Sequence, residues 1–248
     1  MNPFPTVNQD TLIRVSIVVP FFNEVGNVAP LFDNIAAVFA PIPQYDYECV
    51  FVNDGSTDGT REALQSLAAS NPRVRPVHLV RNSGQSAALA AGFQRAQGEY
   101  ILTLDGDLQN DPVDFPHILK LLEAYDCVCG YRAERHDSWF RRLSSRVANR
   151  VRNALLRDGI RDSGCGSKGF RRHCVEHLVP FNGMHRFMAA LLRNAGCTIV
   201  ECPVSHHARH SGVSKYGLNN RLWRGIYDLI GVAWLTRRYV VIRVEGEP

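Results

Sequence analysis

The sequence contains no long hydrophobic run. No stretch approaches the about 18 uninterrupted apolar residues of a membrane-spanning helix, and the most apolar late segment, residues 225–235, is interrupted by Asp228. The first 14 residues carry two prolines and an aspartate in place of an apolar segment, which argues against a signal peptide. We therefore expect no transmembrane segment, and a protein that is either free in the cytoplasm or held peripherally at a membrane.

A regular cysteine framework is also missing. The seven cysteines are an odd number without even spacing, and no C-x-x-C pair occurs. This pattern favours a reducing compartment over a disulfide-stabilised secreted fold. None of the nine histidines forms a recognised zinc pattern with these cysteines, so the spacing argues against a structural zinc site.

Charge of one sign is not in large excess over the whole chain, where 28 basic and 24 acidic residues give a net charge of +4. The distribution is uneven, however. Residues 1–131 hold 7 Lys and Arg against 15 Asp and Glu, residues 132–172 hold 12 against 4, and residues 173–248 hold 9 against 5. The basic part predicts a polyanionic or membrane-surface partner, although solvated helix faces alone would account for some of this charge.

What the 248 residues do contain is the composition of a folded protein, 45% hydrophobic and 21% charged. The first half alternates short apolar runs with segments of helical spacing. The expected strands cover residues 16–20, 49–52, 74–80 and 100–104, and the expected helices cover 27–39, 61–69 and 86–96. This alternation predicts an α/β fold with a mostly parallel, Rossmann-like sheet and helices on both faces, which binds ligands at the carboxyl ends of its strands.

After residue 131 the pattern changes to basic amphipathic segments, with brief strand signals at residues 198–200 and 240–242. No Pro/Gly/Ser-rich linker and no internal repeat separates the two parts. We expect a single domain over residues 1–248, with a nucleotide-binding part at 14–131 and a specialised part at 132–248. The G-x-G-x-x-G match at residues 164–169 is set aside because no convincing strand precedes it.

Two carboxylates follow the fourth expected strand. Asp105 and Asp107 are two residues apart, which would place them on one face where the strand ends, and Gln109 adds a side-chain carbonyl. Hard oxygen ligands of this kind suit Mg²⁺ or Mn²⁺, which bind one or two carboxylates together with substrate phosphates. The alternative interpretation is a solvated Asp-Gly-Asp turn or a helix N-cap.

Polar motifs also follow the other expected strands, at residues 20–24 (PFFNE), 53–58 (NDGSTD) and 81–84 (RNSG). With the D-x-D motif, they resemble the family 2 glycosyltransferases of GT-A fold in order and in approximate spacing. Phe22 stands where relatives often have Tyr, and Gln109 stands where some members have other residues.

That resemblance implies a nucleotide-sugar donor. Glu24 and Asp54 would hold the base and ribose, and Asp105 would contact the nucleotide. The divalent metal would be ligated by Asp105, Asp107 and Gln109. The remaining nucleotide-binding residues implied by the motifs are Pro20, Phe22, Asn23, Ser83 and Gly84. Asp54 and Asp58 have an alternative role as Asx-turn residues.

Motifs in the second half resemble the polyprenyl-phosphate branch of the family, which includes dolichyl-phosphate mannose synthase. They lie at residues 130–132, 162–165, 168–172 and 209–217, and the resemblance is strongest with bacterial undecaprenyl-phosphate sugar transferases. It implies that Arg132, Ser163 and Lys168 hold the acceptor phosphate, and that Arg209 and Lys215 clamp the donor diphosphate. Asp107, Arg132 and Lys168 are the implied catalytic residues. Each cation has the alternative of being an ordinary surface charge.

A phosphate acceptor is already an anion near pH 7, so a general base is unnecessary, and none is obvious in the sequence. The resemblance implies a single displacement with inversion, assisted by the metal. An enzymatic alternative is transfer to a saccharide or another hydroxyl, which would need a carboxylate base. A nucleic-acid-binding module is disfavoured because no recognised binding motif accompanies the basic segment.

Two segments have the pattern of interfacial helices, with apolar residues at helical spacing beside arginines. They cover residues 139–157 and 222–238. Such helices place apolar groups below lipid headgroups and arginines among the phosphates, whereas packing of the same stripes on the sheet is the alternative. We expect peripheral attachment to the inner face of the cytoplasmic membrane, unlike the many relatives that continue into transmembrane helices. The sequence leaves the oligomeric state open, including a homo-oligomer.

Overall fold

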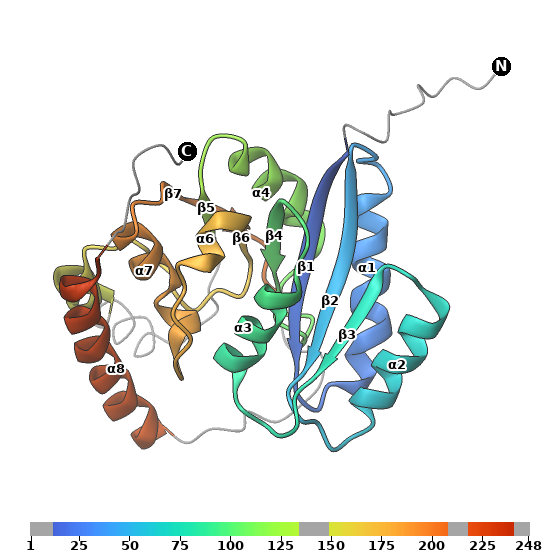
Figure 1. Cartoon of the computed structure of the whole chain (residues 1–248), viewed down its shortest axis with the longest axis horizontal. Coiled ribbons are helices and arrows are strands. Elements are labelled where there is room, and N and C mark those ends of the chain that lie inside the picture. The colour runs from blue at the N-terminus through green and yellow to red at the C-terminus, as the bar shows by residue number, and fades with distance from the viewer. Residues whose placement is uncertain (1–11, 134–148, 208–217, 241–248) are drawn as a thin grey trace.

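The protein, as a computed structural model, is described for residues 12–133, 149–207 and 218–240. It is built on a seven-stranded sheet in the order β3-β2-β1-β4-β6-β5-β7 (Figure 1). The strands are β1 (Ile13–Phe21), β2 (Tyr45–Asn53), β3 (Val74–His78), β4 (Tyr100–Thr103), β5 (Cys127–Arg132), β6 (Lys168–Arg171) and β7 (Ile199–Val204). One sheet therefore includes strands from both the acidic and the basic part of the chain.

The sheet is parallel except for one strand. β1 pairs in parallel with β2 and β4, β2 with β3, and β5 with β7, whereas β6 runs antiparallel between β4 and β5. The carboxyl ends of β1 to β4 consequently meet at one edge, which is where open α/β sheets bind ligands.

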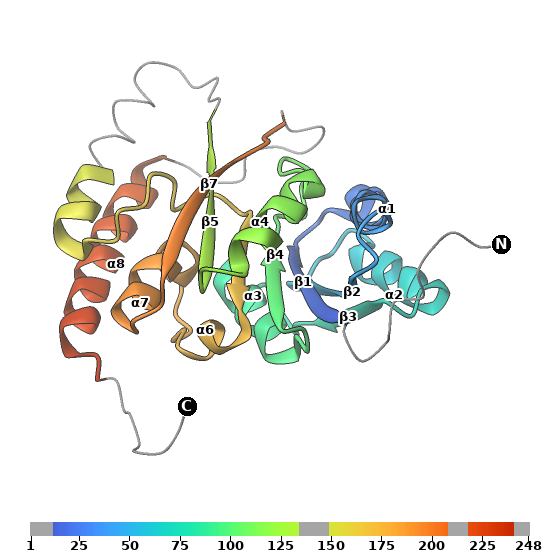
Figure 2. The same cartoon turned by 90° about the horizontal axis from the view of Figure 1, so that it is seen from above.

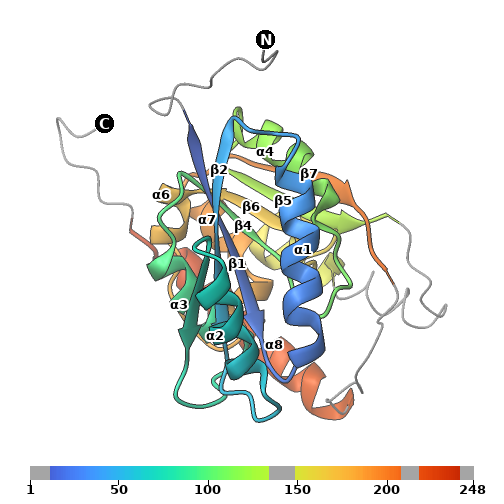
Figure 3. The ribbon, with the colours of Figure 1, turned by 90° about the vertical axis from the view of Figure 1, so that its right-hand side faces the viewer.

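Helices cover both faces of the sheet. Helices α1 (Val28–Phe39), α2 (Thr60–Ser70) and α4 (Phe115–Leu122) contribute to one core, and α3 (Gln85–Arg95), α6 (Arg172–Glu176) and α7 (Met188–Asn194) to the other (Figure 2). Figure 3 shows α1 and α3 on opposite sides of β1 and β2. Helix α8 (Leu218–Arg238) packs on α7 at the far end of the molecule from α2. The described residues also include three short 3-10 turns, η2 (Val25–Asn27), η3 (Pro112–Asp114) and η4 (Met184–Arg186), and a helical segment at 149–156.

The pleat of β1 explains why two cores form. Successive side chains of a strand point to opposite faces, so Ile17 and Val19 enter the core under α1 while Val18 enters the core under α3. All three are fully buried. A strand covered on both faces needs a continuous apolar run, and the run that ends at Pro20 has this character.

The α/β class and the elements expected in the first half are confirmed. The structure contains two strands that the sequence pattern did not indicate, β5 at the end of the first part and β6 within the polar motif at residues 168–172. Val240 is not in a strand, and the rest of the signal at 240–242 lies outside the described residues. No helix in the described part of the chain combines the length and apolarity needed to cross a bilayer.

Candidate active site

Two loops at the carboxyl edge of the sheet hold each other through side chains. The Asn23 backbone N–H donates to Ser56 Oγ at 2.9 Å, and Asn23 Oδ1 accepts from the Thr57 N–H at 2.8 Å. Asn23 has a φ of 54°, a left-handed conformation that Asn tolerates better than most residues. The loop after β1 is therefore fixed against the loop after β2.

Asp54 organises the loop after β3. Its Oδ1 accepts from the Ser83 N–H at 2.7 Å and its Oδ2 from the Gly84 N–H at 2.8 Å, and Asn82 Nδ2 lies 3.1 Å from Oδ2. Burial raises the pKa of Asp54, while the two backbone hydrogen bonds oppose that rise. The loop that it shapes includes Gly84, whose φ of 89° favours glycine. Base and ribose binding by Asp54 stays a prediction.

The other residues of the first two motifs lie at the same edge. Pro20 is still in β1, where it pairs with Val52, and Phe22 lies just beyond the strand. Glu24 accepts a 2.6 Å hydrogen bond from Asn27 Nδ2. Asp58 accepts from the backbone and the hydroxyl of Thr60 at the start of α2, which is the turn role considered for it above.

The D-x-D motif lies in a loop and not on the strand. β4 ends at Thr103, so the expectation that alternation along a strand aligns Asp105 with Asp107 is wrong. The loop itself sets their positions. A Cβ on Gly106 would meet the Phe21 ring at 2.7 Å, and Leu108 has a φ of 59°. Backbone strain of this kind is tolerated only where the surroundings enforce it, and it is concentrated at functional sites.

Asp105 is surrounded by neutral donors and by charges of both signs. Its Oδ1 accepts from Gln85 Nε2 at 2.7 Å. The pKa of Asp105 is raised to about 6, mainly by burial and also by the neighbouring Asp107, while Lys168 and Arg132 act in the opposite direction. A buried carboxylate next to a second carboxylate is stabilised by a cation, so the donor set fits a divalent ion.

Asp107 and Gln109 complete this loop. The Gln109 N–H donates to Asp107 Oδ1 at 3.2 Å, and the Gln109 carbonyl accepts from the His207 N–H at 2.8 Å. The loop is therefore attached to the segment that follows β7. Arg209 and Lys215, the expected diphosphate clamp, lie outside the described residues.

The structure gives each of the three expected acceptor-side residues a partner within the protein. Arg132 makes a bidentate pair with the buried Asp162, through Nε to Oδ2 at 2.7 Å and Nη2 to Oδ1 at 2.9 Å. Lys168 is only 4% exposed and donates from Nζ to the Cys165 carbonyl. Ser163 accepts a hydrogen bond from Arg152.

A buried arginine explains the shape of this segment. Arg152, in the helical residues 149–156, is 6% exposed and pairs with Asp158, with Nε 3.0 Å from Oδ2. It also donates to the Ile160 carbonyl. Removing one member of such a pair would leave a buried charge without a partner. Arg152 therefore holds residues 158–163, which include Asp162, against the helical residues 149–156.

Sequence reasoning missed three residues of the site, namely Gln85, His185 and His206. Gln85 and His185 line the same small cavity as Asp105 and the predicted Lys168. Burial, Arg186 and Lys168 lower the pKa of His185 to about 3, and its Nδ1 lies 2.8 Å from Ser86 Oγ. His206 is close enough to Arg132 and Asp107 for both to influence its pKa, which burial lowers. Only Gln85 had a signal, since it directly follows the 81–84 motif.

Comparison with known proteins identifies the class of this chain. The family model described as "Glycosyl transferase family 2" matches residues 16–179. The chain belongs to this family and is a glycosyltransferase.

Curated relatives narrow the comparison. The chain is 38% identical over 231 residues to the dodecaprenyl-phosphate galacturonate synthase of Rhizobium johnstonii, which covers 91% of this chain and 68% of that protein. It is 34% identical to the undecaprenyl-phosphate 4-deoxy-4-formamido-L-arabinose transferase of Aeromonas hydrophila, in an alignment that covers 90% of this chain and 69% of that protein. Both relatives are named as polyprenyl-phosphate sugar transferases, so the resemblance to that branch is confirmed.

Solved structures support the GT-A fold. A mannosyltransferase from Pyrobaculum calidifontis, solved with GDP-Man and Mn²⁺, matches with a TM-score of 0.61 and 20% identity over 94% of this chain and 66% of that chain. The glucosyl-3-phosphoglycerate synthase of Mycobacterium tuberculosis, solved with Mg²⁺ and UDP, has a TM-score of 0.67 and 17% identity, covering 94% and 82%. At these identities the likeness concerns the fold.

Proposed function

We propose that this glycosyltransferase moves a sugar from a nucleoside-diphosphate sugar to a polyprenyl phosphate, with the help of Mg²⁺ or Mn²⁺ and with inversion at the anomeric carbon. The observation that carries the proposal is the meeting of opposite charges at Asp105. The carboxylate loop after β4 and the cations Lys168 and Arg132, from a later part of the chain, lie close enough to influence one carboxyl group. A diphosphate leaving group and a phosphate nucleophile both need cations at that point.

Asp105, Asp107 and Gln109 are the residues that would hold the divalent ion. When bound, the ion would stabilise the negative charge that develops on the departing diphosphate. Asp105 is held in orientation by Gln85, and the Gln109 N–H does the same for Asp107. Support of this kind from neighbouring groups keeps metal ligands in place.

The cations behind Asp105 suit a phosphate acceptor better than a hydroxyl acceptor. Lys168 presents a point charge, and Arg132 has its guanidinium oriented by Asp162. A phosphate monoester is already an anion near pH 7, so these residues need only to bind and orient it. Transfer to a saccharide hydroxyl, the alternative, would require a carboxylate base beside the sugar.

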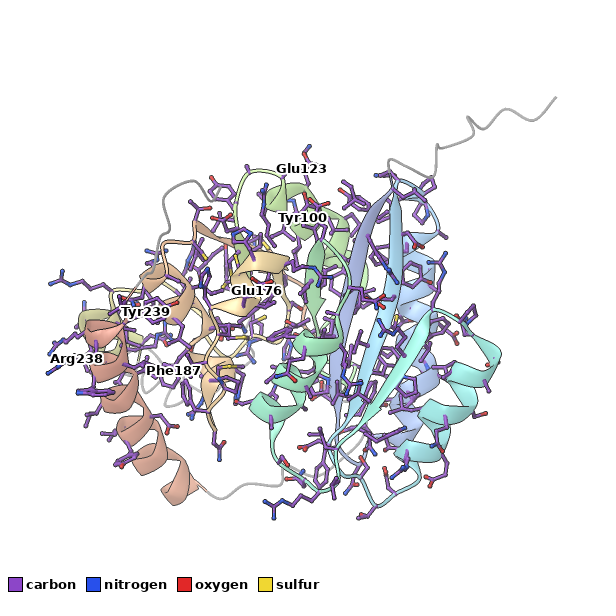
Figure 4. The ribbon with its side chains drawn as sticks, viewed as in Figure 1. Tyr100, Glu123, Glu176, Phe187, Arg238 and Tyr239 are labelled. Atoms are coloured by element: carbon purple, nitrogen blue, oxygen red, sulfur yellow. The ribbon has the colours of Figure 1, made fainter. Side chains whose placement is uncertain are left out.

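The C-terminal helix offers a surface for the lipid. Ile226, Ile230 and Trp234 recur every four residues on α8, and Ile230 and Trp234 are 61% and 63% exposed. Val232, on the opposite side of the helix, and Ala233 are buried. Arg238 lies at the C-terminal end of α8, on the outside of the molecule (Figure 4). An exposed apolar stripe that ends in arginines is suited to peripheral contact with an anionic membrane.

The other segment expected to contact a membrane, residues 139–157, also exposes apolar side chains near arginines. Val151 and Leu155 are exposed, and Arg157 and Arg193 line an open cavity of about 490 Å³ beside α7 and α8. The part of that segment before residue 149 lies outside the described residues. We infer peripheral association with the inner face of the cytoplasmic membrane.

The decisive experiment combines a panel of nucleotide sugars with short polyprenyl phosphates and identifies the products by mass spectrometry. A polyprenyl-phosphate sugar that forms only with added Mg²⁺ or Mn²⁺ supports the proposal. Transfer to saccharide acceptors with none to polyprenyl phosphate would support the alternative. The configuration of the product at the anomeric carbon tests inversion.

A further inference from the structure

A second group of potential metal ligands lies away from the site described above. The ligand atoms of His173, Cys174 and Cys197 all lie within 4.8 Å of one another. Cys174 is buried, Cys197 is partly buried and both thiols are free, while His173 is exposed. Imidazole and thiolate ligands are those that Zn²⁺ prefers.

The carboxylate of Asp126 lies beside the histidine of this group. Asp126 Oδ1 lies 3.4 Å from His173 Nε2. The other oxygen, Oδ2, accepts from the backbone N–H and the hydroxyl of Thr198 at 2.8 and 2.7 Å. One oxygen therefore fixes the carboxylate, while the other faces the same imidazole nitrogen that lies near Cys174 Sγ, as expected for two ligands of one ion.

The distances within the group agree with the edges of a tetrahedron around one ion. With bonds of about 2.05 Å to nitrogen, 2.1 Å to oxygen and 2.3 Å to sulfur, tetrahedral zinc places N and S about 3.6 Å apart and N and O about 3.4 Å apart. His173 Nε2 lies 3.6 Å from Cys174 Sγ and 3.4 Å from Asp126 Oδ1. These two distances from the imidazole nitrogen therefore match those expected around a shared ion, and Cys197 lies within 4.8 Å of the histidine and of Cys174.

The topology places this group at the edge of the sheet opposite to the active site. Asp126 directly precedes β5 and Thr198 directly precedes β7, and both strands run parallel to the strands whose carboxyl ends carry the donor site. β6 is antiparallel, so its end, where α6 brings His173 and Cys174, lies at the same opposite edge. Figure 4 labels Glu176 at the end of this helix. Ligation here would join the starts of β5 and β7 to α6.

We propose that His173, Cys174, Cys197 and Asp126 form a structural binding site for a thiophilic divalent ion, Zn²⁺ in the first place. The exposed imidazole leaves an entry path for the ion. Spacing in the sequence does not reveal the site because its ligands come from three separate segments. The site is independent of the catalytic carboxylates, which are oxygen ligands.

Cobalt substitution distinguishes the two kinds of site. Reduced protein titrated with Co²⁺ is expected to develop a thiolate-to-cobalt charge-transfer band and the intense visible bands of tetrahedral cobalt, saturating at about one equivalent per chain. Added Zn²⁺ should remove the bands. Asp107→Asn should keep them, so that a failure of the proposed catalytic metal site and a failure of this site give different results.

Variants of the ligands provide the controls. His173→Ala changes an exposed side chain and should weaken cobalt binding at least tenfold. Cys197→Ser should lower the intensity of the charge-transfer band by about half or more, because one of the two thiolates is lost. His117→Ala, at an exposed histidine of α4, is the matched control and should bind like the wild type. Thermal melting should show a Zn²⁺-dependent rise in Tm that both ligand variants lose.

Two outcomes would overturn the proposal. One is the absence of a thiolate band from reduced protein whose circular dichroism is native. The other is a band that persists undiminished in both His173→Ala and Cys197→Ser, since the ion would then be bound elsewhere.

Discussion

The acidic loops at the carboxyl edge of the sheet and the basic segment at residues 132–172 are stabilised by different kinds of partner. Asp54 and Asp105 accept hydrogen bonds from neutral groups, namely backbone N–H groups and the amide of Gln85. Arg132 and Arg152 instead pair with the carboxylates of Asp162 and Asp158. Neutral donors orient a carboxylate and leave its charge in place, whereas an ion pair orients both partners and partly offsets the charge of each.

This difference changes the meaning of the charge count. The net charge of residues 132–172 suggests many cations ready for phosphates, but several of them have structural partners. Arg171 donates to the carbonyls of Leu122 and Glu123 after α4, and Arg172 donates to the Gly98 carbonyl. Asp54 and Asp105, by contrast, accept hydrogen bonds from neutral donors, and the charge of Asp105 is the one that we propose a divalent ion to offset.

The largest expected effect tests the preserved negative charge. Asp107→Asn removes one charge from the carboxylate pair and should lower the rate of sugar transfer by about 10³-fold or more, because stabilisation of the leaving group is lost. Transfer is measured with a labelled nucleotide sugar, and the fold by circular dichroism. Asp33→Asn, at an exposed position of α1, is the control. Full activity in excess chelator would refute the metal role.

Breaking the Arg132–Asp162 pair separates structure from function. Arg132→Gln should destabilise the protein by about 2 kcal/mol, less than the about 3–5 kcal/mol of a fully buried pair because 27% of the Arg132 side chain is exposed. It should also raise the acceptor KM or lower kcat, with donor binding unchanged. Urea denaturation and steady-state kinetics measure the two effects.

The double variant Arg132→Gln with Asp162→Asn is the control for this experiment. It should regain much of the stability because no buried charge remains unpaired, but it should not regain activity. Weakened donor binding in either variant would mean that Arg132 serves the nucleotide. Lys168→Met should show the same kinetic pattern as Arg132→Gln.

The exposed face of α8 is tested at a lipid surface. Trp234→Glu combined with Ile230→Glu should lower the vesicle-bound fraction about tenfold or more, since two apolar side chains can no longer enter the interface. Sedimentation with anionic vesicles measures binding, and the Tm should change little because both side chains are exposed. Val179→Glu, at an exposed valine between α6 and η4, is the control. Unchanged binding would show that this face does not contact the membrane.

The smallest expected effect concerns pH and His185. Its pKa of about 3 in the folded protein, against 6.5 as the ordinary value, means that the unfolded chain binds the proton first. Stability should therefore fall as the pH drops below 6.5, by about 1 kcal/mol between pH 6.5 and 5.5. His185→Gln should lose this part of the pH dependence in urea denaturation. An unchanged slope would show that His185 is protonated as easily in the folded state.

Much of the fold was predictable because its signals are local. The apolar runs that form β1, β2 and β4 and the helical spacing of α1 and α3 follow from burial on both faces of a sheet. β5 and β6 were harder to recognise, since they are short and include glycine, lysine or arginine. Lys168 lies in β6 and is buried by its neighbours, which no local pattern indicates.

The sequence by itself determined how strands and helices alternate along the first half of the chain, and which polar motifs follow the first four strands. Periodicity and turn chemistry act over a few residues, so they can be recognised locally. The tertiary structure decided which charges meet. Asp105 lies with Lys168, Arg132 pairs with Asp162, and Cys174 approaches Cys197 through contacts between segments far apart in the chain. Such contacts depend on how the strands are ordered in the sheet, and residue spacing carries no information about that order.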